Sequence, residues 1–186
     1  LITEQLAHRF GTHPGVVGWQ IDNELYIYRD GCYCPACRAA FRDYLRSKYG
    51  TVEELNRRFG MARWSLDYAS FDEIDPPQPN EWRHPSLRTV WRRFQEALIC
   101  AYAREQADIL HRYTKAPVGT DMMPMNNLSY YDMNRPMDVV MYNHYDAADN
   151  LPRTTFFYDF ARPILTHPFW VTETQVGWNG SEWAEC

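Results

Sequence analysis

Two glutamates that follow apolar runs are the residues of this sequence best placed to do chemistry together. Glu24 ends the run 16–24, and Glu173 lies near the end of the run 169–175. Buried strands of parallel sheets are near-continuous apolar runs, so polar residues at their carboxyl ends are expected to face a site. Paired carboxylates of this kind can cleave a glycosidic bond. The alternative is two structural carboxylates engaged in ion pairs.

A cluster of cysteines forms a second group of candidate functional residues. Cys32, Cys34 and Cys37 are three of the five cysteines in the chain. Thiolates this close in sequence can converge on one tetrahedral zinc ion but cannot all pair with one another. A fourth ligand would be Cys100, Cys186, a histidine or a residue outside this chain. We expect a structural zinc site, with reduced thiols at the start of a helix as the alternative.

The composition favours a globular protein and argues against nucleic acid as the main partner. The formal net charge is -5, and Lys and Arg are scattered rather than gathered into a basic tract. No apolar run approaches the roughly 20 residues of a membrane-spanning helix, and no signal peptide is visible. We therefore expect no membrane partner and a cytoplasmic location. Aromatic residues make up 16% of the chain, which suits either sugar binding or core packing.

The elements that must position these groups alternate between strands and helices. Strands are expected at 16–24, 116–121, 138–145 and 169–175. Helices are expected at 1–10, 35–48, 51–59, 86–113 and 153–160, with irregular chain over 61–84. Strands that alternate with helices and end in polar side chains indicate a partial (β/α)8 TIM barrel of the α/β class. An open doubly wound sheet is less favoured, because no Gly-rich phosphate loop follows any expected strand.

Domain organisation follows from the lack of any internal boundary. The sequence has no repeat of constant length, no low-complexity tract and no linker. We predict a single partial catalytic domain over residues 1–186, with no second domain in the chain. Because the chain opens without Met inside a predicted helix, we expect it to be a fragment of a longer protein.

The segment 19–24, followed by the Cys-x-Cys-x-x-Cys cluster, resembles glycoside hydrolase family 42, the β-galactosidases. Further similar segments extend over nearly the whole chain, among them 39–45, 49–51, 64–65 and 71–74. An Asn-Glu pair alone occurs in many barrel glycosidases, but its combination with the cysteine cluster and the Trp-Ser segment is specific. The resemblance implies that this chain spans about strands four to seven of the TIM barrel.

The same resemblance implies roles for individual residues in retaining hydrolysis of terminal β-D-galactosides. Glu24 corresponds to the general acid/base and Glu173 to the nucleophile. Asn23 corresponds to the asparagine that hydrogen-bonds the sugar 2-hydroxyl. Trp64 corresponds to an aromatic of the sugar-binding subsite, and Trp178 is a further candidate for substrate binding.

The resemblance also implies a metal and an assembly. Cys32, Cys34 and Cys37 correspond to three zinc ligands, and the fourth family cysteine lies upstream of this chain. No organic cofactor is expected. The full-length parent is expected to be a homotrimer acting on β-galactoside oligosaccharides.

Two departures from the family pattern bear on the substrate. After the nucleophile the family usually has Pro and Trp at positions that here are Val176 and Ser181, with tryptophans at 178 and 183 instead. The third strand ends in Tyr-Asn-His-Tyr over 142–145, where many relatives have Asp-Asn-Tyr. Two alternatives therefore stay open: a sister β-glycosidase acting on an arabinoside, glucoside or fucoside, and a non-catalytic carbohydrate-binding fragment.

Overall fold

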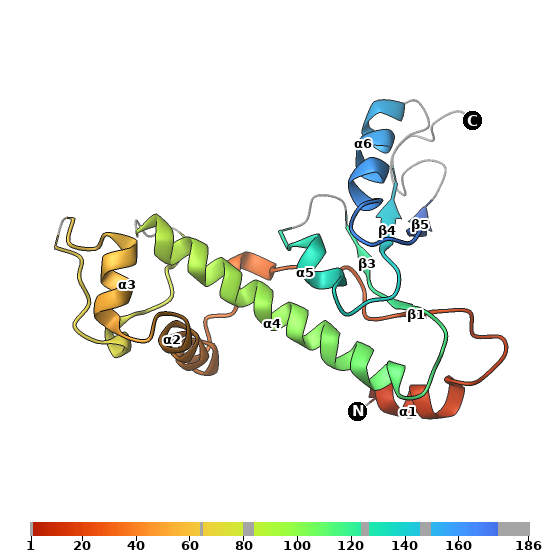
Figure 1. Cartoon of the computed structure of the whole chain (residues 1–186), viewed down its shortest axis with the longest axis horizontal. Helices are drawn as coiled ribbons and strands as arrows, with labels where there is room; N and C mark the ends of the chain where they lie inside the picture. The colour runs from red at the N-terminus through yellow and green to blue at the C-terminus, as the bar shows by residue number, and fades with distance from the viewer. Residues whose placement is uncertain (1, 64, 80–83, 124–126, 146–149, 175–186) are drawn as a thin grey trace. The chain divides into compact units, whose positions relative to one another are not determined.

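The computed structural model describes residues 2–63, 65–79, 84–123, 127–145 and 150–174 (Figure 1). The chain forms two compact units. The first, here called the sheet unit, comprises Leu1–Tyr26 and Ile99–Cys186, and the second, the helical unit, comprises Ile27–Leu98. That residues 1–186 make up one domain stays a prediction.

The sheet unit is built on short strands that all pair in parallel. The strands are β1 (Trp19–Gln20), β2 (Val118–Gly119), β3 (Asp121–Met122), β4 (Met141–His144) and β5 (Trp170–Thr174). β1 pairs with β2, β3 with β4, and β4 with β5. β2 and β3 belong to one extended segment interrupted at Thr120, whose first half pairs with β1 and whose second half pairs with β4. Parallel strands that follow one another in chain order without reversal are the arrangement of a barrel segment.

Helices connect these strands, as the alternating pattern predicts. α1 (Ile2–Phe10) precedes β1, α4 (Pro85–His111) leads to β2, and α6 (Leu151–Ala161) joins β4 to β5. α5 (Tyr130–Asn134) lies between β3 and β4, and the Ser129 hydroxyl accepts the amide N–H of Asp132 at its first turn. Figure 1 shows α6 alongside β4. Within the described ranges, no helix combines the length and the apolar character needed to cross a membrane.

The first strand is shorter than the apolar run 16–24 predicts. Only Trp19 and Gln20 pair with β2, through bonds from the Trp19 N–H to the Pro117 carbonyl (2.9 Å) and from the Ile21 N–H to the Gly119 carbonyl (2.8 Å). Pro117 has no N–H to extend the ladder backward. Val17 is correspondingly 78% exposed. The apolar run therefore overstates the strand.

The helical unit follows its sequence signals closely. α2 (Pro35–Tyr49) begins with Pro in its first turn, and α3 (Val52–Phe59) begins where the Thr51 hydroxyl accepts the Glu54 N–H at 3.2 Å. α3 ends at Gly60, which has φ 65°. Single-turn 3-10 helices cover Tyr28–Asp30 and Phe71–Glu73.

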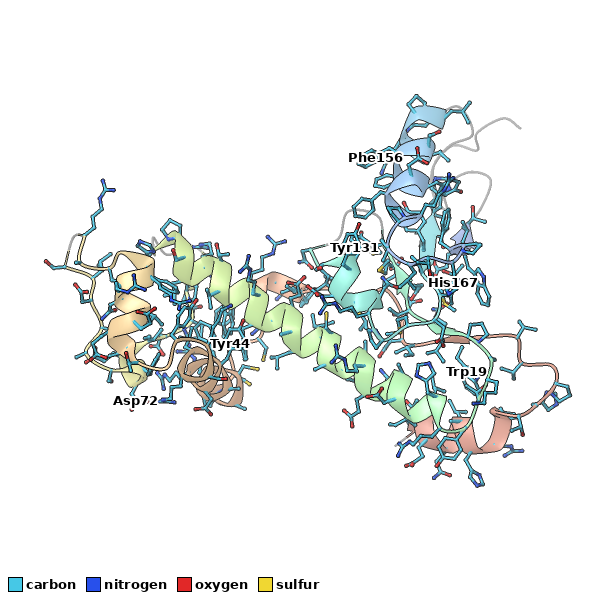
Figure 2. The ribbon with its side chains drawn as sticks, viewed as in Figure 1. Trp19, Tyr44, Asp72, Tyr131, Phe156 and His167 are labelled. Carbon is cyan, nitrogen blue, oxygen red and sulfur yellow. The ribbon has the colours of Figure 1, made fainter. Side chains whose placement is uncertain are left out.

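An apolar core joins α2 and α3 to the first half of α4. Phe41 and Leu45 of α2 are fully buried with Leu55 of α3 and Leu87 of α4. Tyr44, labelled in Figure 2, packs on Phe94 with ring centroids 5.4 Å apart. This core packs against α2, and the cysteine cluster lies at the N-terminus of that helix.

Candidate functional site

Side chains from four parallel segments meet at the carboxyl ends of the strands of the sheet unit. Glu24 follows β1, Asp121 opens β3, Asn143 lies in β4 and Glu173 lies in β5. Asn143 and Glu173 are direct partners in the β4–β5 register. The structure therefore brings together the two glutamates that the sequence singles out.

The turn that presents Glu24 has an unusual backbone. Asp22 and Glu24 have φ values of 54° and 49°, in the left-handed region that residues other than glycine rarely adopt. The Glu24 N–H donates to Asp121 Oδ1 at 3.0 Å. On the other side of the turn, Asp22 Oδ2 accepts the hydroxyl of Tyr102 at 2.6 Å. Conformations of this kind persist only where the surroundings hold them, and they cluster at functional sites.

Two amide side chains and one carboxylate link Glu24 to Glu173. Asn143 Nδ2 donates to Glu24 Oε1 and to Asp121 Oδ2, both at 2.9 Å. In the amide orientation that satisfies its neighbours, Asn23 Nδ2 donates to Asp121 Oδ2 and to Glu173 Oε1, both at 3.2 Å. The two glutamates thus belong to one continuous hydrogen-bond network centred on Asp121.

A β-bulge in β5 sets the position of Glu173. The register pairs Tyr142 with Val171 and then Asn143 with Glu173, so Thr172 is the extra residue. Its hydroxyl donates to Asn143 Oδ1 at 3.0 Å. Bulges re-aim side chains and are frequent beside active sites. Here the bulge places Glu173, rather than Thr172, opposite Asn143.

Glu173 has a second hydrogen-bond donor, Tyr145. The Tyr145 hydroxyl donates to Glu173 Oε2. The hydrogen bond to this carboxylate, together with desolvation, raises the pKa of Tyr145 to about 12. The phenol therefore stays a donor at neutral pH and holds Glu173 Oε2 while Asn23 holds Oε1.

Asp121 is the most enclosed acid of the network. Its exposed fraction is 0%. Burial raises the pKa of Asp121, and the negative charges of Glu173 and Glu24 raise it further, while the hydrogen bonds from the Glu24 N–H and Asn143 act in the opposite direction. The site therefore contains a third carboxyl group whose pKa is raised overall, although N–H donors oppose the shift.

Asp121, Asn143 and Tyr145 were not singled out from the sequence as site residues. The available signal was general, since polar residues at the ends of all expected strands pointed to a site at that edge. The bulge that aligns β5 has no sequence signal of its own. Trp64 and Trp178, the predicted aromatic contacts with sugar, lie outside the described residues.

The three cysteines of the helical unit are also brought together. The Sγ atoms of Cys32, Cys34 and Cys37 all lie within 4.8 Å of one another. Cys34 Sγ accepts the Cys37 N–H at 3.4 Å at the start of α2, and the Cys32 N–H donates to Gln95 Oε1 at 2.9 Å. Thiolates bound to one zinc at about 2.3 Å have sulfur atoms about 4 Å apart. The cluster is therefore spaced to bind a metal ion.

The electrostatics of the cluster also suit a cation. The backbone N–H of Cys37 lowers the pKa of Cys34. Burial and the neighbouring thiols Cys32 and Cys34 raise the pKa of Cys37 to about 12. A positive charge among the sulfur atoms would favour the thiolate form of Cys37. Cys100 belongs to the sheet unit and Cys186 lies outside the described residues, so the fourth ligand stays open.

Comparison with curated proteins finds relatives along nearly the whole chain. The chain is 32% identical over 183 residues to beta-galactosidase YesZ of Bacillus licheniformis, and the match covers 97% of this chain and 28% of the relative. It is 33% identical over 197 residues to beta-galactosidase Bga of Halorubrum lacusprofundi, covering 95% of this chain and 28% of that one. The chain thus spans less than a third of the length of these relatives.

Solved structures of beta-galactosidases are also similar to this chain. The beta-galactosidase of Rahnella sp. R3 matches with a TM-score of 0.89 at 26% identity, covering 100% of this chain and 29% of that structure. These likenesses are those of a TIM-barrel fragment. The family model Glyco_hydro_42, described as beta-galactosidase, matches residues 1–186, and the chain therefore belongs to this glycoside hydrolase family.

Proposed function

We propose that the protein containing this chain is a retaining glycosidase that cleaves terminal β-D-galactosides. The observation that carries the proposal is the hydrogen-bond network that joins Glu24 to Glu173 in a member of the Glyco_hydro_42 family. Paired carboxylates at the carboxyl ends of barrel strands are the machinery of retaining glycosidases.

In the proposed first step, Glu173 attacks the anomeric carbon while Glu24 protonates the departing glycosidic oxygen. A covalent bond forms between a Glu173 oxygen and the sugar, and the glycosidic bond breaks. In the second step, Glu24 removes a proton from water, which attacks the anomeric carbon and frees Glu173. The mechanism requires the two carboxyl groups to lie about 5 to 5.5 Å apart when substrate is bound.

Neighbouring residues support each carboxylate in this scheme. Tyr145 and Asn23 each donate to one oxygen of Glu173, and Asn143 donates to Glu24 Oε1. Donors at both oxygens of Glu173 hold its carboxylate in a fixed orientation, which a nucleophile requires. Asn23 is exposed, so its amide can also meet a sugar hydroxyl, and we propose that this is the 2-hydroxyl.

The substrate class rests on the relatives. The curated relatives at 32% and 33% identity are named beta-galactosidases, which favours a galactoside over the arabinoside, glucoside or fucoside alternatives. A non-catalytic fragment is not favoured, since both glutamates lie in the network. Hydrolysis of a panel of 4-nitrophenyl β-glycosides would rank these sugars directly. We expect the galactoside to give the highest kcat/KM.

Further parts of the proposal concern the metal, the barrel and the assembly. Zinc would be held by Cys32, Cys34 and Cys37 and would fasten the loop before α2, with no part in the chemistry. The chain would supply about strands four to seven of the barrel. Trp64 and Trp178 would contact the sugar. A homotrimeric parent and a cytoplasmic location stay predictions.

The roles of the glutamates are tested by leaving-group dependence in the full-length protein. Glu24→Gln removes the proton donor, which matters most for leaving groups that need protonation. We expect turnover of lactose to be lost, while turnover of 2,4-dinitrophenyl β-D-galactoside falls much less. Glu105→Gln, which changes an exposed glutamate of α4, should leave both rates unchanged. Equal losses on both substrates in Glu24→Gln would contradict the acid/base role.

A further inference from the structure

Asp121 lies at the centre of the site network, yet it has neither of the two roles assigned above. Both of its carboxylate oxygens are occupied by donors. Oδ1 accepts the Glu24 N–H at 3.0 Å, and Oδ2 accepts Asn143 Nδ2 at 2.9 Å and Asn23 Nδ2 at 3.2 Å. The side chain is fully buried, so water cannot replace a lost partner easily.

The contact between Asp121 and Asn23 decides which way the Asn23 amide faces. An asparagine side chain can exchange its carbonyl oxygen and its NH₂ by rotation, and neighbouring groups decide between the two orientations. An ionised Asp121 carboxylate accepts hydrogen bonds but cannot donate them. Asp121 Oδ2 therefore selects the orientation in which Asn23 Nδ2 faces it. The same nitrogen then directs its second hydrogen toward Glu173 Oε1 at 3.2 Å.

We propose that Asp121 is a positioning residue that orients the amide of Asn23, so that one N–H is anchored and the other is available beside Glu173. The inference rests on the proposed function, in which a sugar hydroxyl next to the anomeric carbon approaches Glu173. When substrate binds, the second N–H of the anchored amide donates to that hydroxyl in place of Glu173 Oε1. Asp121 thereby acts on the sugar 2-hydroxyl through Asn23, without touching substrate.

Replacement by asparagine is a sharp test because an amide has one acceptor oxygen where a carboxylate has two. In Asp121→Asn, the single amide oxygen can still accept the hydrogen bond from the Glu24 N–H. The NH₂ group of the new side chain then faces Asn23 and Asn143. Asn23 must then turn its carbonyl toward residue 121, and the same atom would face the Glu173 carboxylate. Asn23 cannot satisfy both neighbours in either orientation.

The experiment compares 4-nitrophenyl β-D-galactoside with its 2-deoxy analogue in the full-length protein. Asp121→Asn should lower kcat/KM on the galactoside by about 10- to 100-fold, because hydrogen bonds to the 2-hydroxyl strengthen in the transition state. On the 2-deoxy analogue the loss should be smaller than on the galactoside by about 5-fold or more, since the contact with the 2-hydroxyl is absent from the start. In an Asn23→Ala background, Asp121→Asn should cost little more on either substrate.

A matched control is Asp138→Asn. Asp138 Oδ2 also accepts a backbone N–H, from Val118 at 2.9 Å, and faces His111 Nε2 at 2.8 Å, but it precedes β4 and takes no part in the site network. Its replacement should affect the two substrates equally. If Asp121→Asn fails to fold, Asp121→Ser supplies the same comparison, because serine also offers fewer acceptor positions than the carboxylate.

Two results would overturn the inference. The first is an equal loss on both substrates in an active protein, which would place the effect on Glu24 or on folding. The second is a full additional loss in the Asn23→Ala background. A wild-type protein that hydrolyses no galactoside would instead overturn the proposed function, and this inference with it.

Discussion

Asp121 carries an unfavourable charge in the folded state, and this has a consequence for stability. Because burial and the nearby glutamates raise its pKa, the folded protein holds the proton of Asp121 to higher pH than the unfolded chain does. The free energy of unfolding therefore contains a part that decreases as pH rises from about 4, the ordinary aspartate value, to the raised pKa. Asp121→Asn should remove this decrease.

Urea unfolding of the full-length protein at several pH values checks the prediction. The slope of unfolding free energy against pH should be more negative for the wild type than for Asp121→Asn, by at most about 1.4 kcal/mol per pH unit for one proton. The prediction would be wrong if the unfolding free energies of the wild type and of Asp121→Asn changed in parallel above pH 4. The Asp121 carboxyl would then titrate alike in the folded and the unfolded protein.

Tyr145 offers a second test at the scale of one residue. Tyr145→Phe removes the hydroxyl that donates to Glu173 Oε2. A hydrogen bond to a charged group contributes about 1.5 to 3 kcal/mol, so kcat/KM on an aryl galactoside should fall by about 10- to 100-fold. Since the pKa of Tyr145 is raised to about 12, the loss should be the same at every pH of an ordinary assay.

The control for this variant is Tyr131→Phe. Tyr131, labelled in Figure 2, lies on α5 and is 54% exposed. Its replacement should leave the kinetics unchanged. Unaltered activity in Tyr145→Phe would mean that the hydroxyl does not support the nucleophile.

At the scale of elements, Gly31 controls the loop that leads to the cysteine cluster. It has φ 114°, and an added Cβ would lie 2.6 Å from Gln95 Cγ. Gln95 Oε1 in turn accepts the Cys32 N–H. Gly31→Ala should therefore displace Cys32 and weaken zinc binding, as measured by competition with a chromogenic chelator.

Gly60→Ala is the matched control for backbone strain. Gly60 also has a positive φ, 65°, but an added Cβ would meet nothing within 4 Å. This variant should lose about 1 kcal/mol of stability from the left-handed conformation and keep its zinc affinity. Equal zinc affinity in Gly31→Ala and Gly60→Ala would mean that the loop at Gly31 does not affect the metal site. A wild-type protein that contains no zinc would favour the alternative of reduced thiols.

The helices could be predicted from the sequence because their end signals are local. Pro35, Thr51 and Gly60 act on the backbone within one turn, and the helices α2 and α3 begin and end where these residues predict. The strand β1 depends on its neighbour, since Pro117 limits the ladder, and apolar character alone could not show that.

The two glutamates of the candidate site could be predicted from the sequence, but the residues that connect them by hydrogen bonds could not. Glu24 and Glu173 stood out as carboxylates at the ends of apolar runs. Asp121 and Asn143 became site residues only once the parallel register was known, because that register and the bulge at Thr172 bring them beside the glutamates. Pairing across distant segments leaves no local pattern in the sequence.

At the scale of the whole molecule, apolar residues exposed on β5 and beside β1, in the part of the chain that the structure describes, predict how residues 1–186 behave alone. Trp170 and Val171 on β5 are each 38% exposed, and Val17 beside β1 is 78% exposed. Barrels remove such edges by closing, and exposed apolar edges favour self-association. Residues 1–186 expressed alone should bind an apolar dye and aggregate, whereas the full-length protein should bind no such dye and should form nothing larger than its expected trimer. The prediction would be wrong if residues 1–186 were monodisperse in light scattering and bound no apolar dye.

The central claim is that Glu173 attacks the sugar while Glu24 handles the proton. The most direct test treats the full-length protein with 2,4-dinitrophenyl 2-deoxy-2-fluoro-β-D-galactoside, which slows the second step and lets the glycosyl-enzyme accumulate. Peptide mass spectrometry should locate the fluorosugar on Glu173. A label on Asp121 or Glu24, or rapid galactoside turnover with no label and an inverted product, would contradict the claim.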